Sequence, residues 1–209
     1  MPRRNYNKGR RAEIEAETAA AIVEATLALH AEHGIQATSY AMIADRAEVS
    51  PQTVYNKFPS RGVLLAACMG HAAESAPQLD VELFGSEPTA AARIRKLVDA
   101  VFDQHAYFAD WARWAWRETQ AVPELKEAFE AEKLVHRRLI TLALTATDGN
   151  KPSHRLVEVA TVLLSYPSWE QLTQTRSSKA AAEIVGECLA ALLGYFEPRS
   201  RAEVPARRK

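Results

Sequence analysis

The segment 38–61 constrains the fold of this chain more than any other. Its apolar spacing predicts two short helices, about 39–47 and 51–57, joined by a tight turn, with Ile43 and Val54 on their buried faces. Thr38 or Ser39 can cap the first of them, and Gly34 is a stop signal for the helix before it. Ser50 is suited to cap the second helix, and Pro51 can occupy its first turn, where a missing N–H costs nothing. A helix this short, firmly held and polar on its outer side suits the major groove of DNA.

The outward-facing side chains of this segment predict two kinds of DNA contact. Gln52, Thr53 and Asn56 are candidates for base edges, because Gln and Asn can pair bidentately with adenine and a Thr methyl can pack on thymine. Nearby hydroxyls and cations suit phosphates, which set register without reading sequence. These candidates are Thr38, Ser39, Tyr40, Tyr55, Lys57 and Arg61, and Ser50 and Pro51 complete the predicted DNA-binding set. The alternative, a helical hairpin whose polar face only meets water, is disfavoured by the whole pattern.

The same segment resembles the TetR family of transcriptional regulators. The matching residues span roughly the first third of the chain, and they are Gly34, Ala37-Thr38, Ile43-Ala44, Arg46-Ala47, Val49-Ser50, Thr53-Val54-Tyr55, Phe58-Pro59-Ser60 and Leu64-Leu65. The resemblance implies an N-terminal three-helix DNA-binding domain, a larger helical domain that binds a small effector, and a homodimer.

Several residues depart from the pattern of that family. Glu48 stands where Gly is usual, and a non-Gly residue in a left-handed turn is strained by about 1 kcal/mol. Lys57 replaces a common His and Arg61 a common Lys, and both keep positive charge available to phosphates. His30 stands where a core aromatic residue is usual.

Composition predicts an all-α protein. The chain is 47% hydrophobic and 25% charged, which is typical of a globular protein. It has only eight glycines, its Ala, Leu, Glu and Arg runs favour helices, and no segment alternates like a strand. No apolar stretch reaches membrane-spanning length and no signal core begins the chain, so we expect a cytoplasmic protein without a membrane partner.

The sequence carries no enzyme signature, and we expect neither catalysis nor a cofactor. It lacks a nucleophile elbow, a phosphate-binding Gly loop, Cys pairs and a His-Glu-Xaa-Xaa-His motif. His30 and His33 lie one turn apart without a third ligand nearby, so we expect surface histidines and no metal. Cys68 and Cys188 are expected to be buried small hydrophobes and not a disulfide.

The net charge is zero, but basic residues gather at both ends of the chain. Residues 1–11 carry five basic side chains and no acid. This arm can follow phosphates or enter a minor groove, or it can be a solvated terminus, and both interpretations stay open. We expect the basic, Pro-containing tail at 198–209 to be a solvated, disordered terminus. A DNA contact is disfavoured there, because the tail lies far in sequence from the predicted recognition helix.

The remaining chain is predicted to form further helices. Their approximate bounds are 12–33, 61–75, 89–108, 123–147, 153–173 with a bend or break near Pro167, and 177–196, with a linker at 77–88 and a separate short aromatic segment at 110–121. We therefore expect a DNA-binding domain at 1–60, which includes the N-terminal arm, and a helical ligand-binding and dimerisation domain at 61–197.

Aromatic residues are concentrated between Phe102 and Trp116. Such residues usually fill the core, and we expect this of more than half of them. The rest are interpreted as the wall of an effector cavity, which is typically apolar with a few orienting polar groups. The candidate effector residues are Phe102, His105, Trp114, Arg117, Phe129, His136, Tyr166 and Trp169.

Small residues recur every four positions in the last predicted helix. Gly costs about 1 kcal/mol against Ala in a helix, so two glycines there suggest that another helix packs closely. A two-fold interface is one explanation, and tight packing within the chain is the other. The candidate interface residues are Ala182, Gly186, Leu189, Ala190, Leu193 and Gly194. In the TetR family, the last two long helices form a four-helix bundle with their copies.

The combined prediction is a dimeric regulator that binds inverted-repeat DNA. We expect a repressor that a small, largely apolar or aromatic effector releases from its operator. The alternative is a small-molecule-binding or carrier protein whose DNA-binding domain is vestigial.

Overall fold

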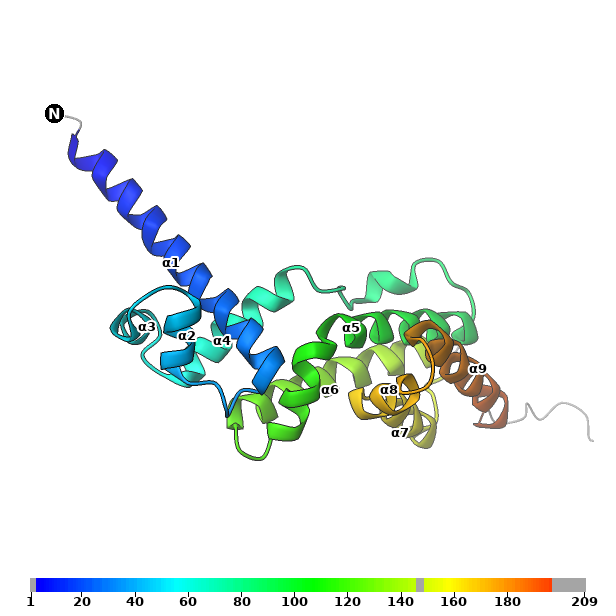
Figure 1. Ribbon diagram of the computed structural model, residues 1–209. Coiled ribbons are helices and arrows are strands. Elements are labelled where there is room, and N and C mark those ends of the chain that lie inside the picture. The colour runs from blue at the N-terminus through cyan, green and yellow to red at the C-terminus, as the bar shows by residue number, and fades with distance from the viewer. Residues whose placement is uncertain (1–2, 146–148, 197–209) are drawn as a thin grey trace, which may run out of the picture. The chain divides into compact units, whose positions relative to one another are not determined.

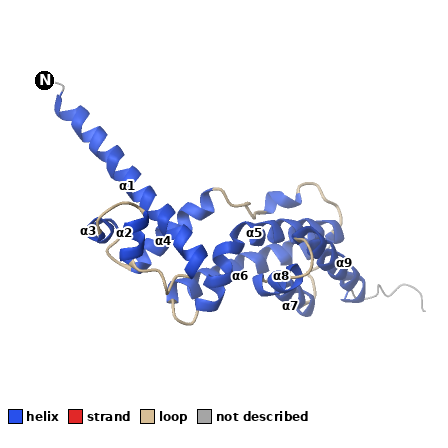
Figure 2. Ribbon diagram, in the orientation of Figure 1, coloured by secondary structure: helices blue, strands red, loops and turns tan. Residues whose placement is uncertain are grey.

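The computed structural model describes residues 3–145 and 149–196, and every regular element in these ranges is a helix (Figures 1 and 2). The α-helices are α1 (Arg3–His33), α2 (Tyr40–Arg46), α3 (Pro51–Lys57), α4 (Arg61–Glu74), α5 (Ala90–Glu118), α6 (Pro123–Leu144), α7 (His154–Leu163), α8 (Tyr166–Thr173) and α9 (Ser178–Phe196). A 3-10 helix, η1 (Val81–Phe84), lies within the predicted linker. The prediction of an all-α fold is confirmed, and the predicted tail at 198–209 lies outside the described residues.

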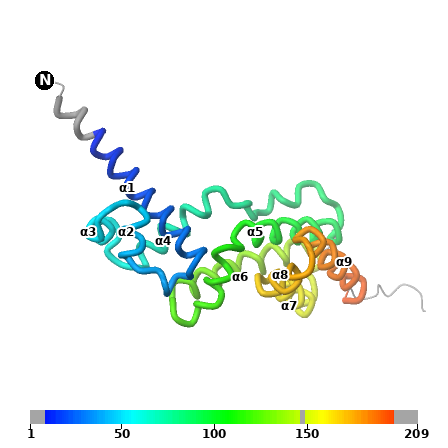
Figure 3. Tube along the Cα trace, in the orientation of Figure 1, coloured from blue at the N-terminus to red at the C-terminus, as the bar shows by residue number. Residues whose placement is uncertain are grey.

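The chain forms two compact units, and each is built from two separate stretches of sequence. Unit 1 comprises Met1–Pro77 and Tyr107–Ala131, and unit 2 comprises Gln78–Ala106 and Glu132–Lys209. Helices α5 and α6, whose paths can be followed along the chain trace in Figure 3, each contribute residues to both units. The predicted functional boundary after residue 60 stays a prediction.

Helices α1 to α4 pack around one apolar core in unit 1. Ile22 of α1, Ile43 of α2, Val54 of α3 and Cys68 of α4 are at most 1% exposed, and they belong to one cluster of buried side chains. Burial of apolar area is the main favourable term in folding, so this cluster holds the short helices α2 and α3 in place.

Serine side chains cap the helices of this unit, as the sequence predicts. The Oγ of Ser39 accepts the Met42 N–H at 3.2 Å at the start of α2, and the Oγ of Ser50 accepts the Thr53 N–H at 3.1 Å at the start of α3. Each bond satisfies one of the N–H groups that a helix start leaves without a partner. Glu48, in the turn between them, has φ 53°, so it adopts the left-handed conformation in which a non-Gly residue is strained.

The aromatic segment predicted to stand alone is part of a longer helix. α5 runs without a break from Ala90 to Glu118, so the separate element expected at 110–121 is wrong. No Gly or Pro lies between residues 90 and 118, and helix formation is cooperative once begun. The first helix is also longer than predicted, since α1 begins at Arg3 and includes most of the basic arm.

The helix predicted at 153–173, bent or broken near Pro167, is broken into two helices. α7 ends at Leu163 and α8 begins at Tyr166, so the break falls at residues 164–165. Pro167 lies in the first turn of α8, where its missing N–H leaves no hydrogen bond unmade. Pro167 therefore lies at the start of a helix and does not kink the middle of one.

Two side chains differ from their predicted burial. His30 is only 7% exposed and is not the surface histidine expected. Cys188 is exposed, because it lies on the outer face of α9, whereas Cys68 is buried as predicted. None of the described helices is both long and apolar enough to cross a membrane.

Candidate DNA-binding surface and effector site

Helix α3 presents a row of polar side chains to solvent. Val54 is completely buried and anchors the helix, while Pro51, Gln52, Tyr55 and Asn56 are exposed. Nε2 of Gln52 donates to Oδ1 of Asn56 at 2.9 Å, so the two amides form one ordered pair one helical turn apart. Further amide donors and acceptors of this pair stay available for base edges.

Two tyrosines support the outer side of α3. The rings of Tyr40 and Tyr55 pack with centroids 4.6 Å apart, and Tyr55 is 54% exposed. Tyr40 is buried, and its hydroxyl donates to the carbonyl of Phe58 at 2.9 Å, at the end of α3. Tyr40 therefore ties α2 to α3, and burial raises the pKa of its hydroxyl.

Thr38 has a similar role within the protein. Its side chain is 3% exposed, and its hydroxyl donates to the carbonyl of Gly34 at 2.7 Å. The hydroxyls of Thr38 and Tyr40 are thus already used inside the domain, which leaves Ser39, Ser50, Thr53 and Tyr55 as the more accessible hydroxyl-bearing residues of the predicted set. The Ser50 and Thr53 hydroxyls lie 2.8 Å apart.

The two cations of the predicted set lie on either side of the end of α3. Lys57 is half-buried, with its Nζ 3.7 Å from a carboxylate oxygen of Glu15 in α1. Arg61 begins α4, is exposed, and donates one hydrogen bond to the carbonyl of Thr38 at 3.3 Å. Within the described ranges this bond uses one of the five guanidinium N–H groups of Arg61, and the others are available to phosphates.

An exposed, polar second helix held by a tight turn defines a helix-turn-helix domain of a DNA-binding regulator. Residues 22–68 match the family model described as bacterial regulatory proteins, tetR family. This segment is therefore a TetR-family DNA-binding domain, and the resemblance seen in the sequence is confirmed.

Solved structures share the fold over most of the chain. The crystal structure of AmtR from Mycobacterium smegmatis is similar at a TM-score of 0.55 and 20% identity, covering 83% of this chain and 84% of that one. A TetR-like transcriptional regulator from Rhodococcus sp. RHA1 is similar at a TM-score of 0.54 and 17% identity, covering 87% of this chain and 97% of the other. No match was found among curated proteins. At these identities the likeness shows a common fold.

The structure divides the predicted effector residues between the two units. Five of them lie in unit 2, and these are Phe102, His105, His136, Tyr166 and Trp169. Trp114, Arg117 and Phe129 lie in unit 1. We therefore use the name histidine cluster for the five residues of unit 2.

The histidine cluster is a buried set of rings. The His105 ring lies 6.0 Å from that of His136, 5.7 Å from that of Tyr166 and 6.0 Å from that of Trp169, measured between centroids. Both histidines are at most 6% exposed. Nε1 of Trp169 donates to the Ser178 hydroxyl at 2.9 Å, which attaches α8 to α9.

Burial keeps both histidines of the cluster neutral. Desolvation lowers the pKa of His105 to about 4 and that of His136 to about 4. Nε2 of His105 lies 2.9 Å from the Leu164 carbonyl and, since a carbonyl only accepts, this nitrogen carries the proton. Nε2 of His136 is buried without a hydrogen-bond partner among the described residues, and the nearest carboxylate oxygen, of Glu132, lies 3.8 Å away. A buried polar atom without a partner is costly unless a ligand or water completes it.

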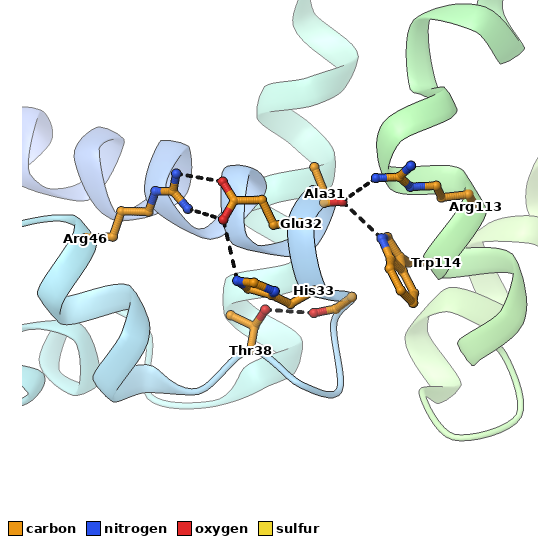
Figure 4. A network of polar contacts seen from close by, with 8 residues as sticks. Ala31, Glu32, His33, Thr38, Arg46, Arg113 and Trp114 are labelled. Atoms are coloured by element: carbon orange, nitrogen blue, oxygen red, sulfur yellow. Dashed lines mark hydrogen bonds and ion pairs between the residues drawn. The ribbon is translucent and has the colours of Figure 1, made fainter.

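Trp114 has a different environment, at the end of α1. The carbonyl of Ala31 accepts the Trp114 indole N–H at 3.0 Å and an N–H of Arg113 at 2.8 Å, and both side chains come from α5 (Figure 4). This carbonyl is in the last turn of α1, where helix carbonyls lack partners inside the helix. Trp111 also donates to α1, at the carbonyl of Leu27, at 3.0 Å.

Glu118, at the end of α5, completes this contact with the loop after α1. Its Oε2 accepts the N–H groups of Ile35 at 2.9 Å and Gln36 at 3.0 Å. Sequence reasoning missed Trp111, Arg113 and Glu118 as residues that hold the DNA-binding helices. No local pattern indicates them, because their partners lie more than eighty residues away in the chain.

Arg117 and Phe129 also have neighbours within unit 1. Arg117 is exposed and donates to the Arg113 carbonyl, one turn earlier in α5. The Phe129 ring lies edge-on to that of Trp116 with centroids 5.5 Å apart, and Phe129 packs against the cluster formed by Leu65, Ala115 and Leu125.

Most of the predicted interface residues are buried within the single chain. Ala182, Gly186, Leu189 and Leu193 are all buried, and a Cβ at position 186 would lie 3.2 Å from Cγ of Arg95. The alternative of close packing inside the chain thus accounts for Gly186. A Cβ at Gly194 would meet nothing within 4 Å, and Ala190 is half-buried, so these two positions stay open to a partner.

No group of three or more His, Cys, Asp or Glu side chains in the described ranges is placed to hold a metal ion.

Proposed function

We propose that the protein is a dimeric transcriptional repressor that binds an inverted-repeat operator and is released from it by a small, largely apolar or aromatic effector. The observation that carries the proposal is α3, whose buried Val54 and capping Ser50 hold an ordered Gln52–Asn56 pair at the surface. Such a helix can enter a major groove and read adenine. The family match at residues 22–68 supports the same reading.

A second copy of the chain is needed to read two half-sites at once. The outer face of α9 offers apolar side chains for this contact, since Ile184 is 47% and Tyr195 is 80% exposed. Gly194, with open space around it, lies on the same helix. Covering these side chains with a partner copy removes apolar area from water, which favours association.

The histidine cluster is the proposed effector site. It combines apolar rings with one buried nitrogen, Nε2 of His136, that has no partner among the described residues. Because both histidines are neutral, the site favours an uncharged ligand whose polar group exchanges a hydrogen bond with His136. Ligand sites are typically built in this way, with few polar groups in an apolar wall.

Binding of effector and of DNA would be coupled through two states of the dimer. The effector must prefer a state whose α3 helices no longer match the half-site spacing, and such couplings are typically about 1–3 kcal/mol. Helix α4, which joins the predicted DNA-binding domain to the rest of the chain, would carry the movement.

Selection of genomic fragments with the purified full-length protein tests the proposal. We expect an enriched inverted repeat with half-sites about one helical turn of DNA apart or a multiple of it. Failure to enrich any repeat, by a protein that still binds small aromatic ligands, would instead favour a carrier protein with a vestigial DNA-binding domain.

A further inference from the structure

Unit 1 contains a cavity of about 240 Å³ below the DNA-binding helices. Four segments line it: the end of α1 with the following loop, the start of α2, the start of α4, and the turn at residues 121–124 between α5 and α6. Ile35, Leu64, Leu65 and Val122 give the cavity apolar walls. All of these segments belong to unit 1, so the cavity is separate from the histidine cluster of unit 2.

One cation lines this cavity. Arg61 reaches it from the first turn of α4, and the hydrogen bond to the Thr38 carbonyl occupies one of its N–H groups. A guanidinium has five N–H donors in a planar fork, and that fork matches a carboxylate through two parallel bonds. The remaining donors of Arg61 therefore suit a ligand carboxylate.

Two further ionisable residues of the cavity, His30 and Glu124, limit which ligands it can bind. His30 is 7% exposed, and burial, together with the charge of Arg61, lowers its pKa to about 4, so its imidazole adds a neutral polar surface. Glu124 lies against the first turn of α4, where a Cβ at Gly62 would be 2.6 Å from Oε1 of Glu124. A second negative group on the ligand would be repelled by the Glu124 carboxylate. The cavity therefore favours a ligand that carries only one carboxylate.

We infer that this cavity is a second ligand site, which binds a small organic monocarboxylate through Arg61 and holds its apolar body against Ile35, Leu65 and Val122. Apolar walls with one convergent cation are the usual construction of a site for such a molecule. The volume is sufficient for a single aromatic ring with a carboxylate.

The same arginine is a predicted phosphate contact, so carboxylate and DNA should compete for it. This consequence depends on the proposed DNA-binding function, whereas binding of the carboxylate does not. The site would thus weaken DNA binding by occupying a contact residue directly, with no change of dimer geometry.

Benzoate is a suitable probe, and benzamide is its uncharged match. Titration of the isotopically labelled full-length protein should shift the backbone amide signals of Ile35, Gln36 and Val122 with benzoate and not with benzamide. Arg61→Gln should weaken benzoate binding about fivefold, the scale of an exposed charge pair. Lys126→Gln removes a charge from the first turns of α6 outside the cavity and should leave binding unchanged.

A filling variant tests the cavity without changing charge. Val122→Phe should abolish the benzoate shifts, provided that circular dichroism shows an intact fold; if this variant does not fold, Arg61→Gln decides the test. Benzoate shifts confined to the histidine cluster, equal shifts with benzamide, or no shifts at all would overturn the inference.

Competition is measured separately with a random-sequence duplex, because phosphate contacts do not depend on sequence. Benzoate should lower the affinity of the wild-type protein for this duplex and leave that of Arg61→Gln unchanged. Absence of duplex binding would contradict the proposed function alone, since the amide shifts report the ligand site by themselves. Benzoate binding at the cavity with unchanged duplex affinity would overturn the competition.

Discussion

The carboxylate of Glu118 accepts the backbone N–H of Ile35 at 2.9 Å, although 83 residues separate them in the chain. With the bond to Gln36, this one side chain satisfies two N–H groups of the loop between α1 and α2. The helix-turn-helix domain is therefore not held by its own core alone. The end of α5 also holds the loop that follows α1.

Glu118→Gln should destabilise the protein by about 1–3 kcal/mol, because the two N–H groups would share a neutral amide oxygen, which is a weaker acceptor than a carboxylate oxygen. Urea denaturation of the full-length protein measures the change. Glu127→Gln removes the same charge from an exposed position in α6 and should change stability by less than about 0.5 kcal/mol. Equal effects of the two substitutions would contradict the structural role of Glu118.

Gly34→Ala should be destabilising for two reasons. Gly34 has φ +86°, where an L-residue costs about 1–2 kcal/mol, and a Cβ there would overlap Oε1 of Glu118. Gly70→Ala is the control, because Gly70 lies in helix α4 with open space around it and should gain about 0.5–1 kcal/mol. Opposite shifts in melting temperature for the two variants are the expected result.

His136→Leu should reduce the loss of stability in mild acid. The pKa of His136 is about 4 in the folded protein and 6.5 in the reference state, so between these values the unfolded chain binds more protons. Lowering the pH through this window therefore favours unfolding, by about 1–2 kcal/mol at pH 5 for this one group. His105 and Glu132 face it and are retained in the variant.

The measurement is the difference in unfolding free energy between pH 7.5 and pH 5. His154→Gln, which changes an exposed histidine of α7, is the control and should keep the wild-type difference. If His136→Leu and the wild-type protein lose the same stability, His136 is already protonated in the folded state.

Gln52→Ala should relax the preference at one base pair of each half-site, at a cost of about 1–3 kcal/mol, because the amide pair with Asn56 is lost at the base edges. Lys57→Ala should instead weaken binding to all sequences alike and flatten the salt dependence. Binding to a library of operator variants at two salt concentrations separates the effects. A uniform loss for Gln52→Ala would assign this residue to the phosphates.

Ile184→Lys should weaken self-association, because burying an isoleucine contributes about 1.5–3 kcal/mol and a lysine in its place brings two like charges to a two-fold interface. Sedimentation equilibrium measures the dimer constant. Val81→Lys, at a position that is 52% exposed in η1, should leave the constant unchanged. A wild-type monomer at micromolar concentration would contradict the proposed dimer.

The helix caps, helix ends and buried positions of the predicted DNA-binding domain could be predicted from the sequence alone. Ser39 and Ser50 act as caps and Gly34 ends α1, because each depends on a few neighbouring residues and on the steric limits of the backbone. Apolar periodicity likewise indicated Ile43 and Val54 as core residues, since a helix can bury only one face.

Only the tertiary structure decided what the aromatic segment does. Trp114 and His105 lie on one helix and have the same aromatic surroundings in sequence, yet Trp114 donates to Ala31 in unit 1 while His105 donates to Leu164 in unit 2. The same holds for Gly186, which belongs to a stripe of small residues in α9. That stripe did not show whether the close neighbour of Gly186 is a partner copy or, as found, Arg95 of the same chain. Such contacts join positions far apart in the chain, and neither residue type nor spacing carries the identity of the partner, because the packing of whole helices determines which side chains meet.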